Sequence, residues 1–353
     1  MISMEENQRQ IDVVDLERLV ELDFVRTTEA AALNAFRWLG KGDPTAAHAA
    51  AVDAMRGTLD STSVSGTVVF GDGLKRQTGG INVGEKLGNW HEGSLAINLA
   101  TVPIDGIDLV ARGIIGALSV IVAVRGDDEN SGLAEIPCRY VTKIAYGPAV
   151  HAGPAQVHLD ASPRDNLEII AMKLGKRVQD LSVLVLERER HKQLIQDIRK
   201  AGASVRLIGD GDIAASIAPS LPQTGIDVYM GIGGATEAVV AAAAIRCLDG
   251  NILVRMAPVD EADKNMIKEK VSAKALDRVY TADDLARGDN VIFCATGISD
   301  SCVLRGVHVD GNQTTTSSAV MRARYKTVRY IRAIHDLSKK TIRLRSANAE
   351  YKL

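Results

Sequence analysis

The stretch Thr67–Gly113 reads TVVFGDGLKRQTGGINVGEKLGNWHEGSLAINLATVPIDGIDLVARG, and its order of apolar runs and turns decides the fold. Two short apolar runs, Thr67–Phe70 and Ala96–Val102, have the composition of β-strands. Each is followed by a turn that carries a carboxylate, Asp72 in the first case and Asp105 in the second. Hard cations such as Mg²⁺ need oxygen ligands of this kind, often shared with a phosphate. The stretch therefore predicts a metal and phosphate site built on two strand ends.

The composition is that of a large globular chain. With 353 residues, 46% hydrophobic and 24% charged, the chain is long enough for two domains. A net charge of −2 gives no support for nucleic-acid binding or for a membrane surface. No apolar run reaches the length needed to span a membrane, and the N-terminus is polar. We therefore expect a cytoplasmic protein. The four cysteines are scattered without a C-x-x-C spacing, which predicts reduced thiols rather than a zinc site.

Toward the N-terminus, the pattern predicts a loose leader over residues 1–11 and then two helices. These are Asp12–Leu22 and Thr27–Leu39, the second with Thr27 or Thr28 as its cap. A further helix begins at Asp43-Pro44, with Asp43 as N-cap and Pro44 at the first helical position. His48 lies on the apolar stripe of that helix, so we expect it to face inward.

After residue 164 the chain alternates between strands and helices. The predicted strands are Ser182–Leu186, Ser204–Leu207 and Ile226–Met230, and the predicted helices are Glu189–Ala201, Ile213–Ala218 and Thr236–Cys247. This order implies parallel strands with helices on the faces. Ligands bind beyond the carboxyl ends of such strands. The polar residues that directly follow these strands are Arg188, Arg190, Asp210, Asp212 and Glu237.

Several runs together resemble the class II fructose-1,6-bisphosphatases, a branch of the metal-dependent phosphatases that includes the inositol monophosphatases. They are the glycine and proline frame of residues 65–113, the pair Arg190-His191, the run D-G-D-x-A-A-S from Asp210, and the run G-I-G-G-A-x-E from Gly231. The resemblance covers nearly the whole chain from about Thr27. It implies an α/β fold of the inositol-phosphatase and fructose-bisphosphatase type. Residues 1–150 would form the half with a mixed sheet and the metal and phosphate site, and residues 164–353 the parallel α/β half that binds sugar phosphate.

The resemblance implies a sugar-phosphate pocket. Its matching positions are Asp105, Tyr140, Arg188, Glu189, Arg190, Asp210, Gly211, Asp212 and Gly234. Guanidinium groups grip phosphate oxygens in a bidentate fork, and carboxylates accept hydrogen bonds from sugar hydroxyls. Taken alone, Arg188 and Arg190 also fit a solvated charge pair with neighbouring glutamates. Asp210 and Asp212 also fit an ordinary turn and helix cap.

The positions that match the family's metal ligands and catalytic groups are partly changed. Those that keep a ligating atom are Asp72, Asp105, Glu237 and, in place of an aspartate, His48. Val102 stands where the family has its first D-P-I-E-G-T carboxylate, and Ile107 stands where it has the threonine. Neither can ligate a cation or orient a water molecule. The resemblance therefore implies at most one Mg²⁺ or Mn²⁺ ion, or none. Core packing of His48 and simple Asp-Gly turns stay open as alternatives for these residues.

Acidic residues that the family has after the first turn are basic or neutral in this chain. Lys75 and Arg76 could place positive charge where a metal ion lies in the family, and so hold a phosphate.

Two functions are open on these residues. The chain could act on a phosphorylated ketose at a remodelled site, by phosphomonoester hydrolysis or other sugar-phosphate chemistry. Alternatively, it could be a catalytically inactive sugar-phosphate-binding or regulatory paralogue that pairs with an active homologue. In either case the resemblance implies a small-molecule partner and a homo-oligomer, a dimer or a tetramer.

Overall fold

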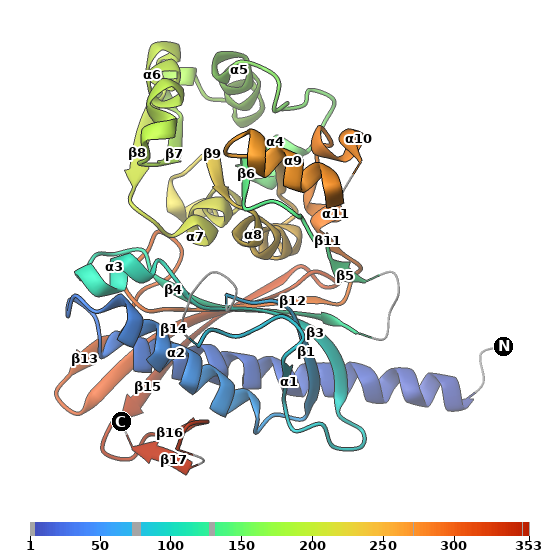
Figure 1. Cartoon of the computed structure of the whole chain (residues 1–353), viewed down its shortest axis with the longest axis vertical. Helices are drawn as coiled ribbons and strands as arrows, with labels where there is room; N and C mark the ends of the chain where they lie inside the picture. The colour runs from blue at the N-terminus through green and yellow to red at the C-terminus, as the bar shows by residue number, and fades with distance from the viewer. Residues whose placement is uncertain (1–3, 73–78, 127–130, 271, 348, 353) are drawn as a thin grey trace. The chain divides into compact units, whose positions relative to one another are not determined.

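The computed structural model describes residues 4–72, 79–126, 131–270, 272–347 and 349–352, and the chain folds into two units. Unit 1 consists of residues 1–129, 292–321 and 329–353, and unit 2 consists of residues 130–291 and 322–328. The units are thus not consecutive along the chain, in contrast to the predicted halves 1–150 and 164–353. The C-terminal strands return to unit 1 and complete its sheet (Figure 1).

Unit 1 is a mixed sheet with helices on one face (Figure 1). Its elements are α1 (Met4–Phe36), α2 (Pro44–Leu59), β1 (Val64–Phe70), β2 (Lys86–Leu87), β3 (Leu95–Asp105), α3 (Ile107–Arg112), β4 (Leu118–Arg125), β12 (Val291–Gly297), β13 (His308–Asp310), β14 (Gln313–Arg322), β15 (Thr327–Asp336), β16 (Thr341–Leu344) and β17 (Ala349–Lys352). The strand order is β13-β14-β12-β4-β3-β1-β2, with β15 also paired to β14. Because β1 and β3 are parallel, their carboxyl ends lie at the same edge of the sheet.

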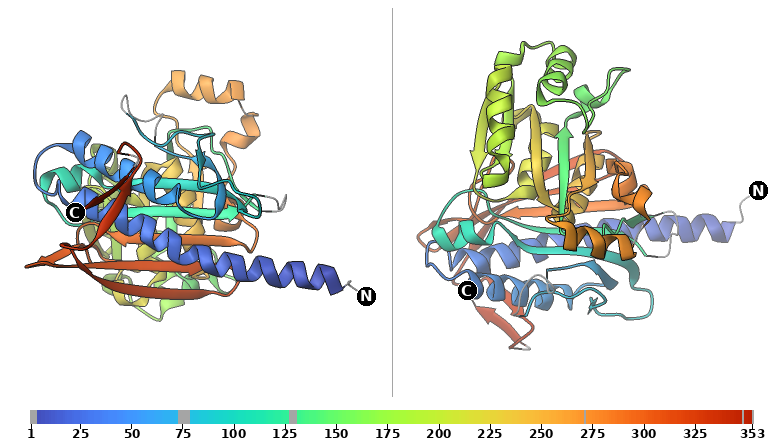
Figure 2. Two further views of the ribbon diagram at one scale, coloured as in Figure 1. Left: turned by 90° about the horizontal axis from the view of Figure 1, so that it is seen from below. Right: turned by 45° about the horizontal axis from the view of Figure 1, so that its top comes forward.

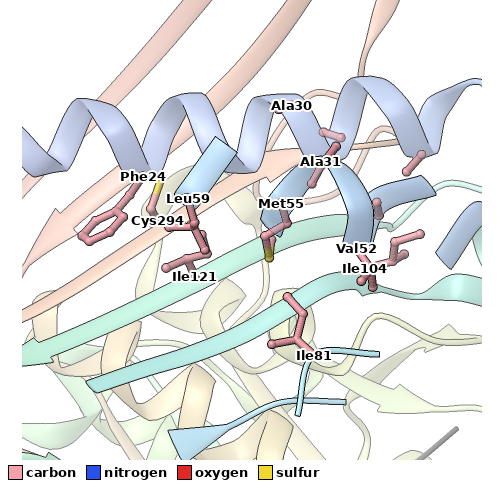
Figure 3. Packing of buried hydrophobic residues seen from close by; sticks show 14 of the residues in the cluster. Phe24, Ala30, Ala31, Val52, Met55, Leu59, Ile81, Ile104, Ile121 and Cys294 are labelled. Atoms are coloured by element: carbon pink, nitrogen blue, oxygen red, sulfur yellow. The ribbon is translucent and has the colours of Figure 1, made fainter. Parts of the chain in front are cut away.

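Helices α1 and α2 pack side by side against this sheet, as the two views in Figure 2 show. Figure 3 shows Phe24 from α1, Met55 and Leu59 from α2, and Ile121 from β4 meeting in one apolar cluster. All four side chains are fully buried. Burial of each contributes roughly 1.5–3 kcal/mol relative to exposure, so this cluster fixes α2 on the sheet.

The N-terminal prediction of two helices is wrong, because α1 is continuous from Met4 to Phe36. Its residues include most of the predicted leader. Thr27 and Thr28 lie inside the helix and do not cap it, since their hydroxyl groups donate to the carbonyl oxygens of Asp23 and Phe24. The hydroxyl oxygens of Thr28 and Thr296 in β12 are 2.8 Å apart. Packing on the sheet thus satisfies a polar residue that the local pattern suggested as a helix start.

Unit 2 is built on a five-stranded sheet in the order β10-β6-β9-β7-β8. Its elements are β5 (Gly132–Leu133), β6 (Tyr140–Tyr146), α4 (Pro148–His151), α5 (Pro163–Leu174), β7 (Ser182–Leu186), α6 (Lys192–Ala201), β8 (Ser204–Ile208), α7 (Asp212–Ile217), β9 (Val228–Gly234), α8 (Ala235–Cys247), β10 (Asn251–Met256), α9 (Glu261–Lys270), α10 (Ala273–Leu276), α11 (Ala282–Leu285) and β11 (Ala286–Arg287). Strand β7 is parallel to both β8 and β9, which confirms the predicted parallel arrangement.

Two of the predicted strands continue further than expected. Strand β3 continues through Pro103 and Ile104 to Asp105, and the chain turns only at Gly106. Strand β9 likewise includes the run 231–234, because that run pairs with β6 in an antiparallel ladder. In both cases a neighbouring strand supplies the pairing that a glycine- or proline-rich run does not predict by itself.

Candidate functional site

His48 and Asp72 come together in unit 1, and we name the group His48, Asp72, Val102, Asp105 and Ile107 the metal side. Asp43 caps α2 by accepting the amide hydrogen of Ala46 at 2.9 Å. His48 lies in the second turn of α2, and only 2% of its side chain is exposed, which confirms that it faces inward. Its Nε2 atom hydrogen-bonds the Oδ2 atom of Asp72, just after β1. Two of the predicted ligands are therefore in direct contact.

The second oxygen of Asp72 is also engaged within the protein. Its Oδ1 atom accepts the amide hydrogen of Ile81 at 3.1 Å. Gly71 lies so close to the carbonyl oxygen of Ile81 that a side chain at position 71 would overlap it. Each carboxylate oxygen has two lone pairs, so a cation at Asp72 would share an oxygen with one of these groups or displace it.

An arginine on α2 fixes the segment that carries Ile81. The Arg56 guanidinium binds both carboxylate oxygens of Glu85, at 2.7 and 2.8 Å, and also donates to the carbonyl oxygens of Gly79 and Gly80. Arg345 reaches the same carboxylate at 2.8 Å. Burial raises the pKa of Glu85, but the hydrogen bond from Arg56 and the other donors outweigh it, so the pKa is lower than usual. The scaffold around Asp72 is therefore held by charged groups.

Asp105 ends β3 at the start of a tight turn. Gly106, with φ of 86°, makes the left-handed turn into α3. Asp105 itself is buried, at 5% exposure. Val102 and Ile107 on either side of it are buried as well, at 9% and 7%. Apolar side chains thus fill the two positions where the resemblance would place a carboxylate and a hydroxyl.

The side chains of the metal side offer only a few donor atoms to a cation. His48 offers one ring nitrogen, and Asp72 and Asp105 offer carboxylate oxygens. Within the described ranges, no cluster of three or more His, Cys, Asp or Glu side chains has metal-site geometry. A nitrogen donor beside carboxylates is compatible with Mn²⁺ more than with Mg²⁺. Lys75 and Arg76, predicted to bring positive charge here, lie outside the described residues.

In unit 2, Arg190 and Tyr140 lie together, and we name the group Tyr140, Arg188, Arg190, Asp210 and Gly234 the sugar-phosphate side. The Arg190 guanidinium carbon is 5.1 Å from the centroid of the Tyr140 ring. Its Nη2 atom donates to the carbonyl oxygen of Ile232 at 2.9 Å. Such stacking orients a guanidinium and leaves other N–H groups for a phosphate.

The two residues that precede Arg190 differ from it and from each other in their contacts. Arg188 is half-buried and donates to the carbonyl oxygen of Glu187 at 3.0 Å. Glu189 is largely exposed and pairs with Lys192 at 2.6 Å. Glu189 is therefore the predicted binding residue with the clearest surface role.

The Asp210-Gly211-Asp212 turn begins α7. Gly211 has φ of 87°, and Asp212 is the first residue of the helix. Asp210 is half-buried, whereas Asp212 is buried at 5% exposure. The Oδ2 atom of Asp212 accepts the amide hydrogen of Gly234 at 3.0 Å. The turn after β8 is thus attached to the end of β9.

Gly234 and Glu237 lie where β9 passes into α8. Gly234 pairs with Tyr140 across the β6–β9 ladder. Glu237 is half-buried in the first turn of α8. Its carboxylate lies against the Cα atom of Gly234, where a Cβ atom would overlap it. The parallel strands β7, β8 and β9 therefore bring Arg190, Asp212 and Gly234 to one edge, while Glu237 belongs to unit 2 and Asp72 to unit 1.

Sequence reasoning missed three residues that contact the residues of this edge: His191, Lys143 and Tyr229. His191 Nε2 accepts the amide hydrogen of Ile232 at 2.8 Å, and its Nδ1 atom lies 2.6 Å from the carbonyl oxygen of Leu186. Burial lowers the pKa of His191, which favours the neutral ring that this arrangement requires. The pair Arg190-His191 in the sequence was a signal that could have pointed to His191. A lone lysine in an apolar strand was the signal for Lys143.

Comparisons with known proteins agree over almost the whole chain. The family model described as "Bacterial fructose-1,6-bisphosphatase, glpX-encoded" matches residues 18–335. A D-fructose 1,6-bisphosphatase class 2/sedoheptulose 1,7-bisphosphatase of Synechococcus sp. is 36% identical over 337 residues, which covers 89% of this chain and 94% of that protein. A fructose-1,6-bisphosphatase class 2 of Haemophilus influenzae is 38% identical over 333 residues, which covers 91% of this chain and 97% of that protein.

Among the described residues, no helix has the length and apolar character needed to cross a membrane.

Proposed function

We propose, because this chain belongs to the class II fructose-1,6-bisphosphatase family, that it binds a phosphorylated ketose and hydrolyses its phosphate monoester at a remodelled site. The observation that carries the proposal is Arg190, which is stacked on Tyr140 at the carboxyl edge of the unit 2 sheet. This edge is where α/β sheets bind ligands.

On the sugar-phosphate side, Arg188 and Arg190 would grip the phosphate, and Asp210 and Gly234 would meet the sugar. A planar guanidinium gives two parallel hydrogen bonds to a phosphate, which fixes its orientation. Arg190 is held by Ile232 and Tyr140 before any ligand arrives, so little conformational entropy is lost on binding. Asp105, Glu189, Gly211 and Asp212 remain predicted substrate contacts from the resemblance.

On the metal side, the remodelling would slow the chemistry. A divalent ion polarises a phosphoryl oxygen and activates a water molecule when it is bound. Asp72 and Asp105, with His48, would hold at most one such ion, and Glu237 remains a further predicted ligand from the resemblance. His48, Asp72, Asp105 and Glu237 are also the candidates for acid and base roles. Val102 and Ile107 supply no ligating atom, so part of the charge stabilisation of the family is missing.

The buried Val102 and Ile107 favour a second candidate, a catalytically inactive sugar-phosphate-binding or regulatory paralogue. In that case the sugar-phosphate side would bind its ligand and hydrolysis would be absent. Such a paralogue would exert its effect by pairing with an active homologue while it holds the sugar phosphate. Phosphate release distinguishes the two candidates, whereas ligand binding is common to both.

The test measures phosphate release from fructose 1,6-bisphosphate and sedoheptulose 1,7-bisphosphate with Mg²⁺ or Mn²⁺, together with calorimetric titration of fructose 6-phosphate. We expect binding of fructose 6-phosphate, and turnover that is at least about 100-fold below the usual kcat range of about 1–1,000 s⁻¹, faster with Mn²⁺ than with Mg²⁺. Turnover at ordinary rates would show that the metal side is not impaired. Binding without any phosphate release would select the inactive candidate, and absence of both would contradict either one.

A further inference from the structure

We propose that Lys143, Asp212 and Tyr229 form a buried clamp that positions the carboxyl end of β9, and that the sugar-phosphate side depends on this clamp for its shape. The inference rests on the proposed function, because the ligand it concerns is the phosphorylated ketose. It gives Asp212 a positioning role in addition to its predicted contact with the sugar.

The clamp lies in the interior of unit 2. The side chain of Lys143 is 0% exposed and that of Asp212 is 7% exposed, and the Lys143 Nζ atom is 2.7 Å from Asp212 Oδ1. Tyr229, also fully buried, donates its hydroxyl hydrogen to the same Oδ1 atom at 2.7 Å. A buried charge is costly unless it is paired and hydrogen-bonded, so each member of the clamp requires the others.

The clamp replaces a missing strand partner. Among the residues that the structure describes, β9 pairs with β7 at Val228 and Tyr229 only, and no described strand pairs with that edge of β9 beyond them. Side chains take the place of the strand there. His191 accepts the amide hydrogen of Ile232, and Asp212 accepts that of Gly234. Because the amides of residues 232 and 234 are used in this way, they hold the end of β9 in place and do not cradle the phosphate.

The backbone of β9 packs closely against the clamp. A Cβ atom at Gly233 would overlap both the Asp212 carboxylate and the Cε atom of Lys143. The backbone at Gly233 thus rests directly on the ion pair. A shift of Asp212 moves Gly234, which pairs with Tyr140 and touches Glu237. Through these contacts the clamp sets the position of the Tyr140 ring on which Arg190 stacks.

The experiment compares Tyr229→Phe and Lys143→Met with Leu167→Ala, a matched control. Leu167 is fully buried in α5 of the same unit, so its truncation lowers stability without touching the clamp. Affinity for fructose 6-phosphate is measured by calorimetry, well below the melting temperature of each variant. We expect a roughly 3- to 10-fold loss for Tyr229→Phe, a larger loss for Lys143→Met, and no change for Leu167→Ala. Unchanged affinity in Tyr229→Phe would overturn the positioning role, whether or not Lys143→Met folds.

Amide hydrogen exchange without ligand separates this inference from the proposed function. We expect faster exchange at Ile232 and Gly234 in Tyr229→Phe and not in Leu167→Ala. If the wild-type protein fails to bind fructose 6-phosphate but these amides respond as expected, the function is wrong and the clamp is real. If the wild-type protein binds and the amides do not respond, the clamp is wrong.

Discussion

The metal side and the sugar-phosphate side differ in what their polar groups do. On the sugar-phosphate side, Arg190 and Tyr140 are tied into the sheet by contacts that leave donors for a ligand. On the metal side, His48 and Asp72 are bonded to each other, and Val102 and Ile107 are apolar. The polar groups of the metal side are thus engaged mainly with the protein itself, whereas the Arg190 guanidinium is oriented by its neighbours at the edge of the unit 2 sheet.

The largest effect is expected from restoring oxygen atoms on the metal side. Val102→Asp combined with Ile107→Thr should raise phosphate release from fructose 1,6-bisphosphate with Mn²⁺ by about 100-fold, because each added ligand strengthens charge stabilisation. Without metal the double variant should melt earlier, since a buried carboxylate lacks a partner. Added Mn²⁺ should raise its melting temperature more than that of the wild-type protein.

The control for this gain is Val102→Asn with Ile107→Thr, which has similar volume but a weaker, neutral ligand. It should gain much less activity. Equal activity of the wild-type protein and the Asp variant would contradict the view that the missing oxygen atoms limit catalysis.

Removing the main guanidinium of the sugar-phosphate side should have the next largest effect. Arg190→Ala should weaken fructose 6-phosphate binding by about 10- to 100-fold, because a charge-assisted bidentate contact is lost. Calorimetry measures the affinity. Arg199→Ala is the matched control, since Arg199 is an exposed arginine in the last turn of α6. Equal losses in both variants would point to general electrostatics.

The scaffold of the metal side can be tested apart from its ligands. Arg56→Ala should lower the free energy of unfolding by about 1–2 kcal/mol, because Glu85 and the carbonyl groups of Gly79 and Gly80 lose a donor. Urea denaturation measures the change, and Arg56→Lys should restore part of it. Arg26→Ala breaks an exposed pair with Asp23 and should change stability by less than about 0.5 kcal/mol. If Arg56→Ala also lowers the free energy of unfolding by less than about 0.5 kcal/mol, other contacts hold the segment that carries Ile81.

The smallest effect concerns pH. Burial lowers the pKa of His191 from its ordinary value of 6.5, so the unfolded chain takes up a proton first as the pH falls. The stability contributed by the neutral ring is complete above pH 6.5 and is lost as the pH falls toward the folded pKa. Urea denaturation at pH 7.5, 6.5 and 5.5 should show a smaller acid-side loss in His191→Gln than in wild-type protein. His158→Gln, at an exposed histidine, should behave like wild type.

Local patterns predicted much of the fold correctly. The Asp43 cap, with a proline after it, starts α2 as predicted. The parallel strands of unit 2 follow from alternating apolar and helical segments. The wrong predictions concern Thr27 and Thr28 in α1 and the end of the strand predicted at Ile226–Met230, which continues to Gly234 as β9. Long-range partners decide these elements, namely Thr296 and strand β6, and a local pattern contains no information about such partners.

The sequence by itself determined the family of the chain and which atoms its side chains can offer, namely a guanidinium at Arg190 and no side-chain ligating atom at Val102 and Ile107, because residue identity alone fixes which atoms can ligate or donate. Only the tertiary structure decided how the retained groups are used. It paired His48 with Asp72, and it buried Lys143 against Asp212 so that a predicted sugar ligand holds Gly234. The physical reason is that hydrogen-bond partners of buried polar groups are set by packing between distant segments, which spacing along the chain does not specify.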